Sequence, residues 1–363
     1  MTEEKNIEPK KKLEGLGKKL VKDIDEKKNP SMEIPVRSLS NVSFNQKTKM
    51  LELGSSTSNR YFFNVSHIRK FVQTIEVAGT AKELMESNKH ISLRQAFYKM
   101  KRTIPNTNID IVEEQSESDS ALEDLELITG CSREQMHINA KKAGSIAGNV
   151  IIEDSGDIID WSKMGSGGWS IPSNVEEIKF KKVDAKFIIY MEKDTMWTRI
   201  NEDKYWKKAN CIIVASQGQS TRGIRRLLQR LQLEYGLPIY VLVDADPWGA
   251  YIYSVLKFGS ISLAHSSETM AITNAKFLGL SADDIEKYDL KRHIIKFKDV
   301  DKARIKQIRA YDWFKDNKEW QRQFDLWEKF GGKVELDALV AKGVSFISDT
   351  YLPEKLKNKD WLE

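Results

Sequence analysis

The chain has 363 residues, of which 40% are hydrophobic and 31% are charged, and its net charge of +5 is too small by itself to indicate an anionic partner. The length suggests two domains, the apolar runs are strand-sized, and Cys131 and Cys211 have no metal-type spacing. The N-terminus lacks the apolar core of a signal peptide. Together these features exclude a disulfide framework and a membrane protein, and they indicate a cytoplasmic protein.

The first sixty residues are predicted to form a charged N-terminal tail and short strands. Residues 1–30 are rich in Lys and Glu with few apolar positions, which favours a solvated, partly disordered tail. A weak helix from Lys11 to Ile24 that docks a partner is the alternative. Residues 34–65 alternate between apolar and polar side chains, as short strands with turns do.

Residues 61–160 are predicted to form a helical domain that closes with a hairpin. Helices are expected near residues 66–77, 80–87, 93–103, 120–129 and 133–140, and a β-hairpin near 144–162. Short helices followed by a hairpin are typical of a winged helix, a variant of the helix-turn-helix. The segment "MGSGGWSIPSN", rich in Gly and Ser, lies in the linker that we expect at 161–182.

The remaining domain, residues 183–363, alternates between strands and helices. Strands are predicted at 187–191, 211–215 and 239–243, and helices after them at 196–207, 221–235 and 247–258. Such alternation implies parallel strands joined by right-handed crossovers, and the rest of the chain to Glu363 is expected to be mainly helical. The predicted fold is therefore mixed α/β: a winged-helix domain followed by an α/β domain with a parallel sheet.

Three acidic residues stand where two of these strands end. Asp244 and Asp246 follow one strand and point the same way if the strand continues, and Glu192 follows another. Because parallel strands bring their carboxyl ends to one edge, the three side chains can converge there. Carboxylates without a nearby His or Cys favour Mg²⁺. The alternative is structural: Asp246 before Pro247 is a good helix N-cap, although this does not account for Asp244.

A basic helix precedes the third strand. In "STRGIRRLLQRLQLEYG" the leucines supply a packing face, and the arginines lie largely elsewhere on the helix. Cations beside a carboxylate cluster suit a nucleic-acid backbone, so Arg222, Arg225 and Arg226 are candidate DNA contacts. A solvated helix face is the alternative, and it is favoured for Arg230.

The stretch "HISLRQAFYKMKRTIP" predicts a helix with a tyrosine on its polar side. The apolar stripe of this helix consists of Leu93, Ala96, Phe97, Met100 and Ile104. Tyr98 falls opposite that stripe, between Arg94 and Arg102. Lys101 is nearby. This setting suits a nucleophile, because positive charge favours the phenolate and arginines hold phosphate. A surface tyrosine packed over arginine stems is the alternative.

Together these segments resemble the topoisomerase VI A-subunit family, the type IIB DNA topoisomerases of archaea and their relatives that make meiotic double-strand breaks. The likeness runs from about Phe62 to the C-terminus. "SLRQAFYKMKR" resembles the family's nucleophile motif, an Arg followed by two aromatics, of which the second is catalytic. The resemblance implies Tyr98 as the nucleophile, with Arg94 in a catalytic role. The family often has Tyr-Tyr where this chain has Phe97-Tyr98, so one candidate remains.

The second half resembles the toprim domain of the same family. "YMEK", "ASQGQSTRGIRRLL" and "VDADPWGAYIYSVLKFGSISLAH" are similar to its motifs, which implies Glu192, Asp244 and Asp246 as the metal ligands. "EKDTMWTRI" departs from the usual residues after Glu-Lys, which leaves the role of Lys193 open.

The resemblance also implies a reaction and its partners. Tyr98 would attack a DNA phosphodiester and become linked to the new 5′ end, assisted by Mg²⁺, and the 3′ hydroxyl would reseal the break. A homodimer would make a staggered double-strand break, each tyrosine working with the toprim acids of the other protomer. The sequence has no G-x-x-x-x-G-K-[ST], so ATP hydrolysis would belong to a separate B subunit in an A2B2 heterotetramer.

We therefore expect a nucleoid-associated enzyme that binds double-stranded DNA and contacts the B subunit through residues 1–60. A double-strand-break initiator without strand passage is the main alternative. An inactive DNA-binding relative is a further alternative, and retention of Tyr98 with all three acids argues against it. A toprim nuclease or primase without a tyrosine intermediate is another, and the Tyr98 motif is the feature that discriminates it.

Overall fold

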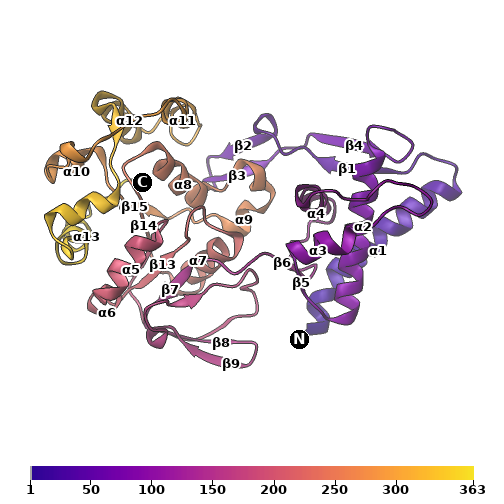
Figure 1. The fold of residues 1–363 in the computed structure, drawn as a ribbon, viewed down its shortest axis with the longest axis horizontal. Coiled ribbons are helices and arrows are strands. Elements are labelled where there is room, and N and C mark those ends of the chain that lie inside the picture. The colour runs from indigo at the N-terminus through magenta and orange to yellow at the C-terminus, as the bar shows by residue number, and fades with distance from the viewer. Residues whose placement is uncertain (1) are drawn as a thin grey trace. The chain divides into compact units, whose positions relative to one another are not determined.

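The computed structural model describes residues 2–363, and the side chains from residue 7 onward. The chain forms two compact units (Figure 1). The first consists of the chain up to Val42 and of Leu53–Lys141, and the second consists of Ser43–Glu52 and Lys142–Glu363.

The first unit is mainly helical, with short strands. Its helices are α1 (Thr2–Asp25), η1 (Leu39–Asn41), α2 (Ile68–Ser87), α3 (Leu93–Met100) and α4 (Gln115–Thr129). Its strands are β1 (Ser31–Pro35), β4 (Thr57–Tyr61), β5 (Ile91–Ser92) and β6 (Ile138–Asn139). Strands β1 and β4 pair antiparallel, whereas β5 and β6 pair in parallel. The hairpin β2 (Val42–Asn45) and β3 (Met50–Leu53) carries residues 43–52 of the second unit.

The N-terminal segment is a helix, so the prediction of a partly disordered tail was wrong. Helix α1 is longer than the alternative that the sequence suggested, and it buries Leu13 and Leu20. With Leu16 these side chains recur at helical spacing and pack with residues of α2, including Phe71 and Val77. The composition of this segment is mostly charged and by itself predicted disorder. The helix is instead stabilised by a narrow apolar stripe that packs on a neighbouring helix.

Two further local predictions for this unit also differ from the structure. The helices expected at 66–77 and 80–87 are the single helix α2, and the helix expected at 133–140 does not form. Instead His137 takes a positive φ of 61°, and Ile138 pairs with Ile91 in a short parallel bridge. Arg133 is buried on the Glu126 carboxylate, with Nη2 2.8 Å from Oε2. Tertiary contacts therefore override the local helical pattern here.

The second unit is built on a six-stranded mixed sheet in the order β10-β7-β13-β12-β14-β15. The central strand β12 (Ile188–Met191) pairs in parallel with β13 (Ile212–Ala215) and β14 (Ile239–Leu242), and all residues of these strands are buried. Strand β15 (Lys276–Phe277) continues the parallel part, and β7 (Ser145–Ala147) and β10 (Trp169–Ser170) add antiparallel strands. The predicted mixed α/β fold with a parallel sheet is confirmed.

Helices connect and surround this sheet. Those between and directly after the parallel strands are α5 (Asp194–Glu202), α6 (Tyr205–Lys208), α7 (Arg222–Tyr235) and α8 (Pro247–Phe258). The C-terminal part holds η3 (Ile261–Ser266), α9 (Ser267–Met270), α10 (Ala282–Lys287), η4 (Lys291–His293), β16 (Ile295–Lys296), α11 (Asp299–Arg309), α12 (Lys318–Phe330), β17 (Gly332–Lys333), η5 (Leu336–Lys342), η6 (Ile347–Tyr351) and α13 (Leu352–Asn358). The expectation of a mainly helical C-terminal part agrees with the structure.

The hairpin that the sequence analysis assigned to a winged helix lies in the second unit. It is formed by β8 (Val150–Asp154) and β9 (Asp157–Asp160), and β11 (Lys179–Val183) joins it to make a three-stranded sheet beside η2 (Trp161–Lys163). Val150 and Ile152 point into the large core of the second unit, together with Trp161. Hydrophobic contacts thus assign this hairpin to the sheet-bearing unit rather than to the helices that precede it.

A buried ion pair links two helices of the C-terminal part. Lys355 on α13 and Asp284 on α10 are each 1% exposed, and Lys355 Nζ lies 2.7 Å from Asp284 Oδ2. The same carboxylate oxygen accepts the Ser281 N–H in a capping box and the Tyr351 hydroxyl. A fully bonded carboxylate of this kind depends on its counter-ion, because an unpaired charge in this place would be very costly.

Replacing Lys355 with Met should therefore lower the stability of the second unit by about 3–5 kcal/mol, since the Asp284 carboxylate would stay buried without its cation. The double variant Lys355→Met/Asp284→Asn should recover most of this loss, because Asn keeps the capping oxygen and carries no charge. Differential scanning calorimetry of both variants measures the effect. A single variant as stable as the unmodified chain would show that the pair contributes little.

Candidate functional site

The three predicted acids lie at one edge of the central sheet of the second unit. Met191 pairs with Leu242 at the ends of β12 and β14, so Glu192 directly follows one strand and Asp244 and Asp246 come shortly after the other. Asp244 is 8% exposed, Asp246 is 9% exposed, and Glu192 is half-buried. The sequence prediction that strand ends bring these side chains near one another agrees with this arrangement.

Burial and mutual repulsion act together on this edge. Burial is the main cause that raises the pKa of Glu192, and the charges of Asp244 and Asp246 raise it further. Burial also raises the pKa of Asp244, and it raises the pKa of Asp246 to about 6, with the Asp244 charge as the largest repulsion. Three carboxylates at one edge thus disfavour their own ionisation unless positive charge is supplied.

Backbone N–H groups hold one oxygen of each aspartate. Asp246 caps α8 through the Gly249 N–H at 2.5 Å, with Pro247 at the first helical position, and Asp244 Oδ1 accepts the Leu336 N–H at 2.7 Å. Gly249 is required here, because a Cβ would stand 2.5 Å from the Asp244 carbonyl oxygen. The capping role of Asp246 is therefore real, and each aspartate keeps Oδ2 for another partner.

A segment ninety residues further along the chain completes this edge. Ala245 and Val334 form an antiparallel bridge, with N–H···O distances of 2.9 and 3.2 Å. An antiparallel register about this bridge sets Lys333 beside Asp246 and Glu335 beside Asp244. The sequence analysis did not single out this segment as part of the site. The sequence feature that could have indicated it is the alternation of charged and apolar residues in "KVELD", which is typical of a half-buried strand.

Two lysines neutralise the acid edge. Lys193 Nζ lies 2.9 Å from Asp244 Oδ2, 2.8 Å from Glu335 Oε2 and 2.9 Å from Asp337 Oδ2. Burial disfavours the ammonium of Lys193, but hydrogen bonds to Glu335 and Asp337 outweigh it and raise the pKa. Lys333 Nζ lies 3.8 Å from Asp246 Oδ2.

The chemistry of this edge fits a divalent cation such as Mg²⁺. The donors are hard carboxylate oxygens, and the cluster of like charges needs a counter-charge. In the part of the chain that the structure describes, however, no group of three or more His, Cys, Asp or Glu side chains is arranged so that it could hold a metal ion. The Lys193 ammonium lies 2.9 Å from Asp244 Oδ2, an oxygen that a cation would use.

A shallow depression opens beside these acids. It has a volume of about 410 Å³ and is lined by residues that follow β12 and β13 and by residues at the start of η5, namely Glu192, Lys193, Asp194, Thr195, Gln217, Gly218, Glu335 and Asp337. Half of these residues are acidic, which suits a cation and the phosphates that the cation would neutralise.

The tyrosine helix α3 lies in the first unit. Ser92 and Gln95 form a capping box, in which Gln95 N donates to Ser92 Oγ at 3.2 Å and Ser92 N donates to Gln95 Oε1 at 2.8 Å. The apolar side of α3 buries Phe97, whereas the next residue, Tyr98, is 58% exposed. The capping box fixes where the helix begins, and burial of its apolar side leaves the phenol facing solvent.

Arg94 is the cation that meets the Tyr98 hydroxyl. Its Nη2 lies 3.2 Å from Tyr98 Oη, and its guanidinium lies 5.3 Å from the centre of the ring. The Arg94 Nη1 group donates to Gln115 Oε1 at 3.0 Å, which orients the guanidinium. Of the other predicted cations, Arg102 pairs with Glu76 and Lys101 lies over the Phe97 ring. A positive charge therefore stands at the phenol oxygen through Arg94 first of all.

The basic helix α7 differs from the sequence prediction at one position. Arg225 is 2% exposed, so it does not face solvent as a DNA contact, and this expectation is corrected. Residues four apart share a helix side, and Gln229 is buried by hydrogen bonds to the carbonyls of Glu268 and Ala271. Helix α7 therefore has a second buried side, which covers Arg225. Burial lowers the Arg225 pKa to about 10.

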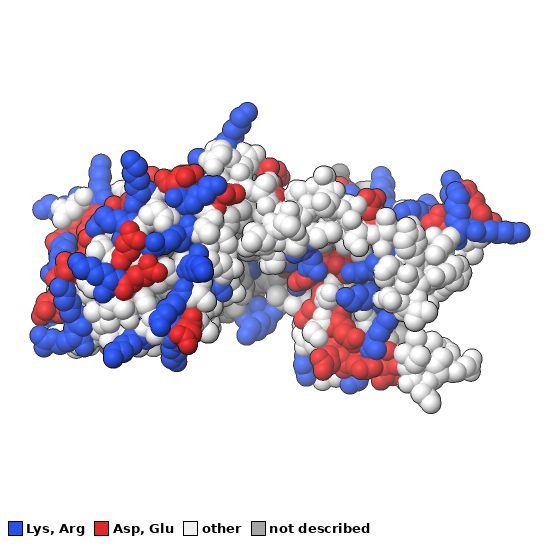
Figure 2. All heavy atoms as spheres, turned by 90° about the horizontal axis from the view of Figure 1, so that it is seen from above, with Lys and Arg blue, Asp and Glu red and all other residues white. Residues whose placement is uncertain are grey.

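The other two predicted DNA contacts on α7, Arg222 and Arg226, remain half-buried at the surface. Arg226 forms a two-pronged ion pair with Glu176, with Nε 2.5 Å and Nη2 3.1 Å from the carboxylate oxygens. Arg222 stands at the first turn of α7. On the face that Figure 2 shows, positive and negative side chains are interspersed rather than gathered into one basic surface. The charge pattern of this face alone therefore does not mark a DNA path.

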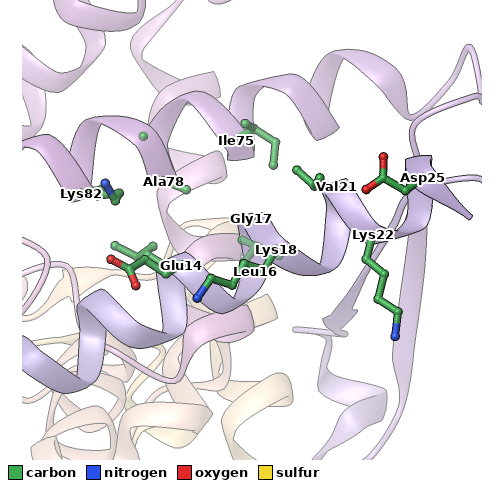
Figure 3. Close-up of a pocket in the computed structure, with 12 residues that line it drawn as sticks. Glu14, Leu16, Gly17, Lys18, Val21, Lys22, Asp25, Ile75, Ala78 and Lys82 are labelled. Atoms are coloured by element: carbon green, nitrogen blue, oxygen red, sulfur yellow. The ribbon is translucent and has the colours of Figure 1, made fainter.

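A groove separates α1 from α2 in the first unit (Figure 3). It has a volume of about 620 Å³, and its lining is Leu13, Glu14, Leu16, Gly17, Lys18, Val21, Lys22, Asp25, Ile75, Ala78, Gly79 and Lys82. The floor is apolar, and the charged side chains stand along it. Gly17 and Gly79 have open space where a side chain would be.

Known protein families match residues 69–356 of the chain in three consecutive segments. Residues 69–138 match the family "Type IIB DNA topoisomerase", and residues 141–184 match "All-beta domain in DNA topoisomerase VI alpha subunit". Residues 187–356 match the Toprim domain that the A subunit of topoisomerase 6 shares with Spo11. No helix in the described part of the chain is long and apolar enough to cross a membrane.

Curated relatives agree with these matches, and all three named here are A subunits of DNA topoisomerase 6. The protein of Pyrococcus abyssi, a type 2 topoisomerase, is 45% identical over 96% of this chain and 93% of its own. The corresponding protein of Hyperthermus butylicus is 38% identical over 99% of this chain and 98% of its own. The protein of Arabidopsis thaliana is 32% identical over 92% of this chain and 76% of its own.

Proposed function

Because the chain belongs to the type IIB DNA topoisomerase family, as a relative of the topoisomerase 6 A subunits, we propose that it cleaves and rejoins DNA through Tyr98. One observation carries the assignment of the nucleophile: the exposed Tyr98 hydroxyl lies 3.2 Å from the Arg94 guanidinium. The neighbouring aromatic, Phe97, has no hydroxyl and is buried, so Tyr98 is the one phenol of this motif.

In the proposed reaction the Tyr98 oxygen attacks a DNA phosphorus. The phenol loses its proton to solvent or a base, the new O–P bond links Tyr98 to the 5′ end, and the 3′ oxygen leaves with a proton as a hydroxyl. Arg94 stabilises negative charge on the phenol oxygen and on the phosphate as both develop. Attack by the 3′ hydroxyl on the phosphotyrosine reverses these steps, so no external energy is needed to reseal the strand.

Glu192, Asp244 and Asp246 are the residues that would hold Mg²⁺ in this proposal. A cation held by these residues would supply positive charge that neutralises DNA phosphates. The chain itself positions the two aspartates, through the N–H groups of Leu336 and Gly249. Tyr98 belongs to the first unit and the acids to the second, which is compatible with the proposal that a homodimer combines the tyrosine of one protomer with the acids of the other.

We further propose strand passage driven by a separate ATPase partner in an A2B2 assembly. The relatives are named as one subunit of a type 2 topoisomerase, and the chain has no phosphate-binding G-x-x-x-x-G-K-[ST] motif of its own. The names of these relatives favour a topoisomerase over an initiator of recombination breaks that lacks strand passage. Arg222, Arg226, Lys101 and Arg102 remain candidate DNA contacts, and we propose that the enzyme acts in the cytoplasm on the nucleoid.

The groove between α1 and α2 is the proposed contact for that ATPase partner. It lies within the N-terminal sixty residues and the helix on which they pack, and its apolar floor with flanking lysines and acids suits an amphipathic helix. Phe63 and Val65, which follow β4 within the first unit, are further exposed apolar side chains.

Tyr98→Phe should abolish covalent trapping and leave DNA binding intact, because only the phenol oxygen is lost. The measurement mixes the chain with its ATPase partner, supercoiled plasmid, Mg²⁺ and a non-hydrolysable ATP analogue, and then counts protein-linked 5′ ends after denaturation. Tyr235→Phe, which removes another exposed phenol oxygen, is the matched control and should trap normally. An adduct that persists in Tyr98→Phe would refute the nucleophile.

Asp246→Asn separates the capping role from the metal role. Asn still accepts the Gly249 N–H, so the variant should keep its thermal midpoint, whereas Asp246→Ala should lose about 1 kcal/mol with the cap. Both variants, and Asp244→Asn, should reduce Mg²⁺-dependent cleavage by about a hundredfold or more, the loss expected for a transition-state interaction. Normal cleavage by Asp246→Asn would mean that Asp246 is a helix cap and nothing else.

Filling the groove should weaken the ATPase partner's binding without unfolding the chain. Gly79→Leu or Gly17→Leu places a side chain in open space on the groove, and Leu favours the helix over Gly. Gly15→Leu changes an exposed glycine of α1 outside the groove and serves as the control. Binding measured by calorimetry should fall for the first two variants only; equal affinities would place the partner elsewhere.

A further inference from the structure

Lys193 has an unusual set of partners at the acid edge. A lysine ammonium has three N–H donors, and here three carboxylates lie within 2.9 Å of Nζ. Asp244 belongs to the proposed metal ligands, whereas Glu335 and Asp337 do not. The one ammonium therefore joins the metal-binding group to a second pair of acids outside it.

The three carboxylates that contact Lys193 differ in how deeply they are buried. The Asp244 side chain is 11% exposed, and those of Glu335 and Asp337 are 46% and 44% exposed. Lys193 stands between a buried acid on one side and two solvated acids on the other. Because a lysine is a flexible stem with a rotatable point charge, it can leave Asp244 and keep the other two contacts.

We propose that Lys193 is a displaceable counter-ion of the acid edge. Without a divalent cation, its ammonium neutralises Asp244, and when a cation binds, Glu335 and Asp337 hold the ammonium aside. The inference rests on the proposed metal role of Glu192, Asp244 and Asp246. It makes Lys193, Glu335 and Asp337 positioning residues, which set the affinity for the cation without touching DNA.

Lys333, the second lysine of this edge, does not share this role. Its Nζ is closer to Asp301, at 3.3 Å, than to Asp246, at 3.8 Å. Asp301 is 1% exposed and also accepts the Trp248 indole N–H and the Lys298 N–H, so it is a fixed partner. Lys333 therefore stays on Asp301, and the exchange belongs to Lys193.

The arrangement accounts for the charge balance of this edge. Lys193 pairs with Asp244 and Lys333 with Asp246, so each buried aspartate has a cation beside its Oδ2 atom. Of the two lysines, Lys193 alone is also bonded to acids outside the proposed metal ligands that can hold it when it leaves.

The test is a double-variant cycle on the full-length chain, with the dissociation constant of Mn²⁺ read by electron paramagnetic resonance. Lys193→Met should bind Mn²⁺ roughly three- to thirtyfold more tightly, the coupling typical of contacting charged groups. Glu335→Gln/Asp337→Asn should bind it more weakly by about the same factor, because Lys193 then rests on Asp244. Lys181→Met, a charge-matched change at a lysine paired with Glu153 on β8, should leave the affinity unchanged.

The deciding measurement is the triple variant. If the two acids act through Lys193, replacing them in the Lys193→Met background should change the affinity less than about twofold. An equal loss in both backgrounds would mean that Glu335 and Asp337 act on the cation directly, and it would overturn the inference. So would an unchanged or weaker affinity in Lys193→Met, with thermal midpoints confirming that the variants fold.

The same titration distinguishes this inference from the proposed metal site. If Asp244→Asn binds Mn²⁺ as well as the unmodified chain, the metal site itself is wrong and the inference falls with it. If Asp244→Asn loses binding while Lys193→Met has no effect, the metal site stands and only the counter-ion role is lost.

Discussion

Repulsion among carboxylates at one edge of a buried sheet is the constraint around which the second unit is arranged. Strands β12 and β14 carry Glu192, Asp244 and Asp246 to this edge, where burial raises the pKa of each. Backbone N–H groups take one oxygen of each aspartate, and lysines approach the others. Such a cluster is costly in a folded protein, so its presence indicates a function that uses the charge.

The nucleophile is built on a different principle. Tyr98 and Arg94 are one helical turn apart on α3, and their contact follows from a capped helix with one apolar side. Little beyond this helix is needed, apart from Gln115 on α4, which orients Arg94. The two parts of the site therefore lie in separate units of the chain. Local helix geometry presents the phenol to solvent, whereas contacts between distant segments bring the acids together.

Most of the arginine side chains that the sequence offered as DNA contacts are buried or paired with acids in the folded chain. Arg225 is covered by the second buried side of α7, and Arg226 is paired with Glu176. Beyond the end of α3, Arg102 is turned to Glu76. An arginine can be classified as basic from its sequence, but whether its charge faces solvent depends on which helix packs against it.

The sequence by itself determined the elements whose signals are local. Apolar runs indicated β12, β13 and β14 to within a residue, helical spacing separated Tyr98 from Phe97, and Asp-Pro marked the start of α8. Tertiary structure decided the rest. The charged segment of α1 is helical because Leu13 and Leu20 meet α2, and the β8–β9 hairpin belongs to the second unit because its buried residues meet that core. Lys333, Glu335 and Asp337 join the acids through a bridge that spans ninety residues. Pairing between segments so far apart depends on the closure of the whole unit, which no local pattern encodes.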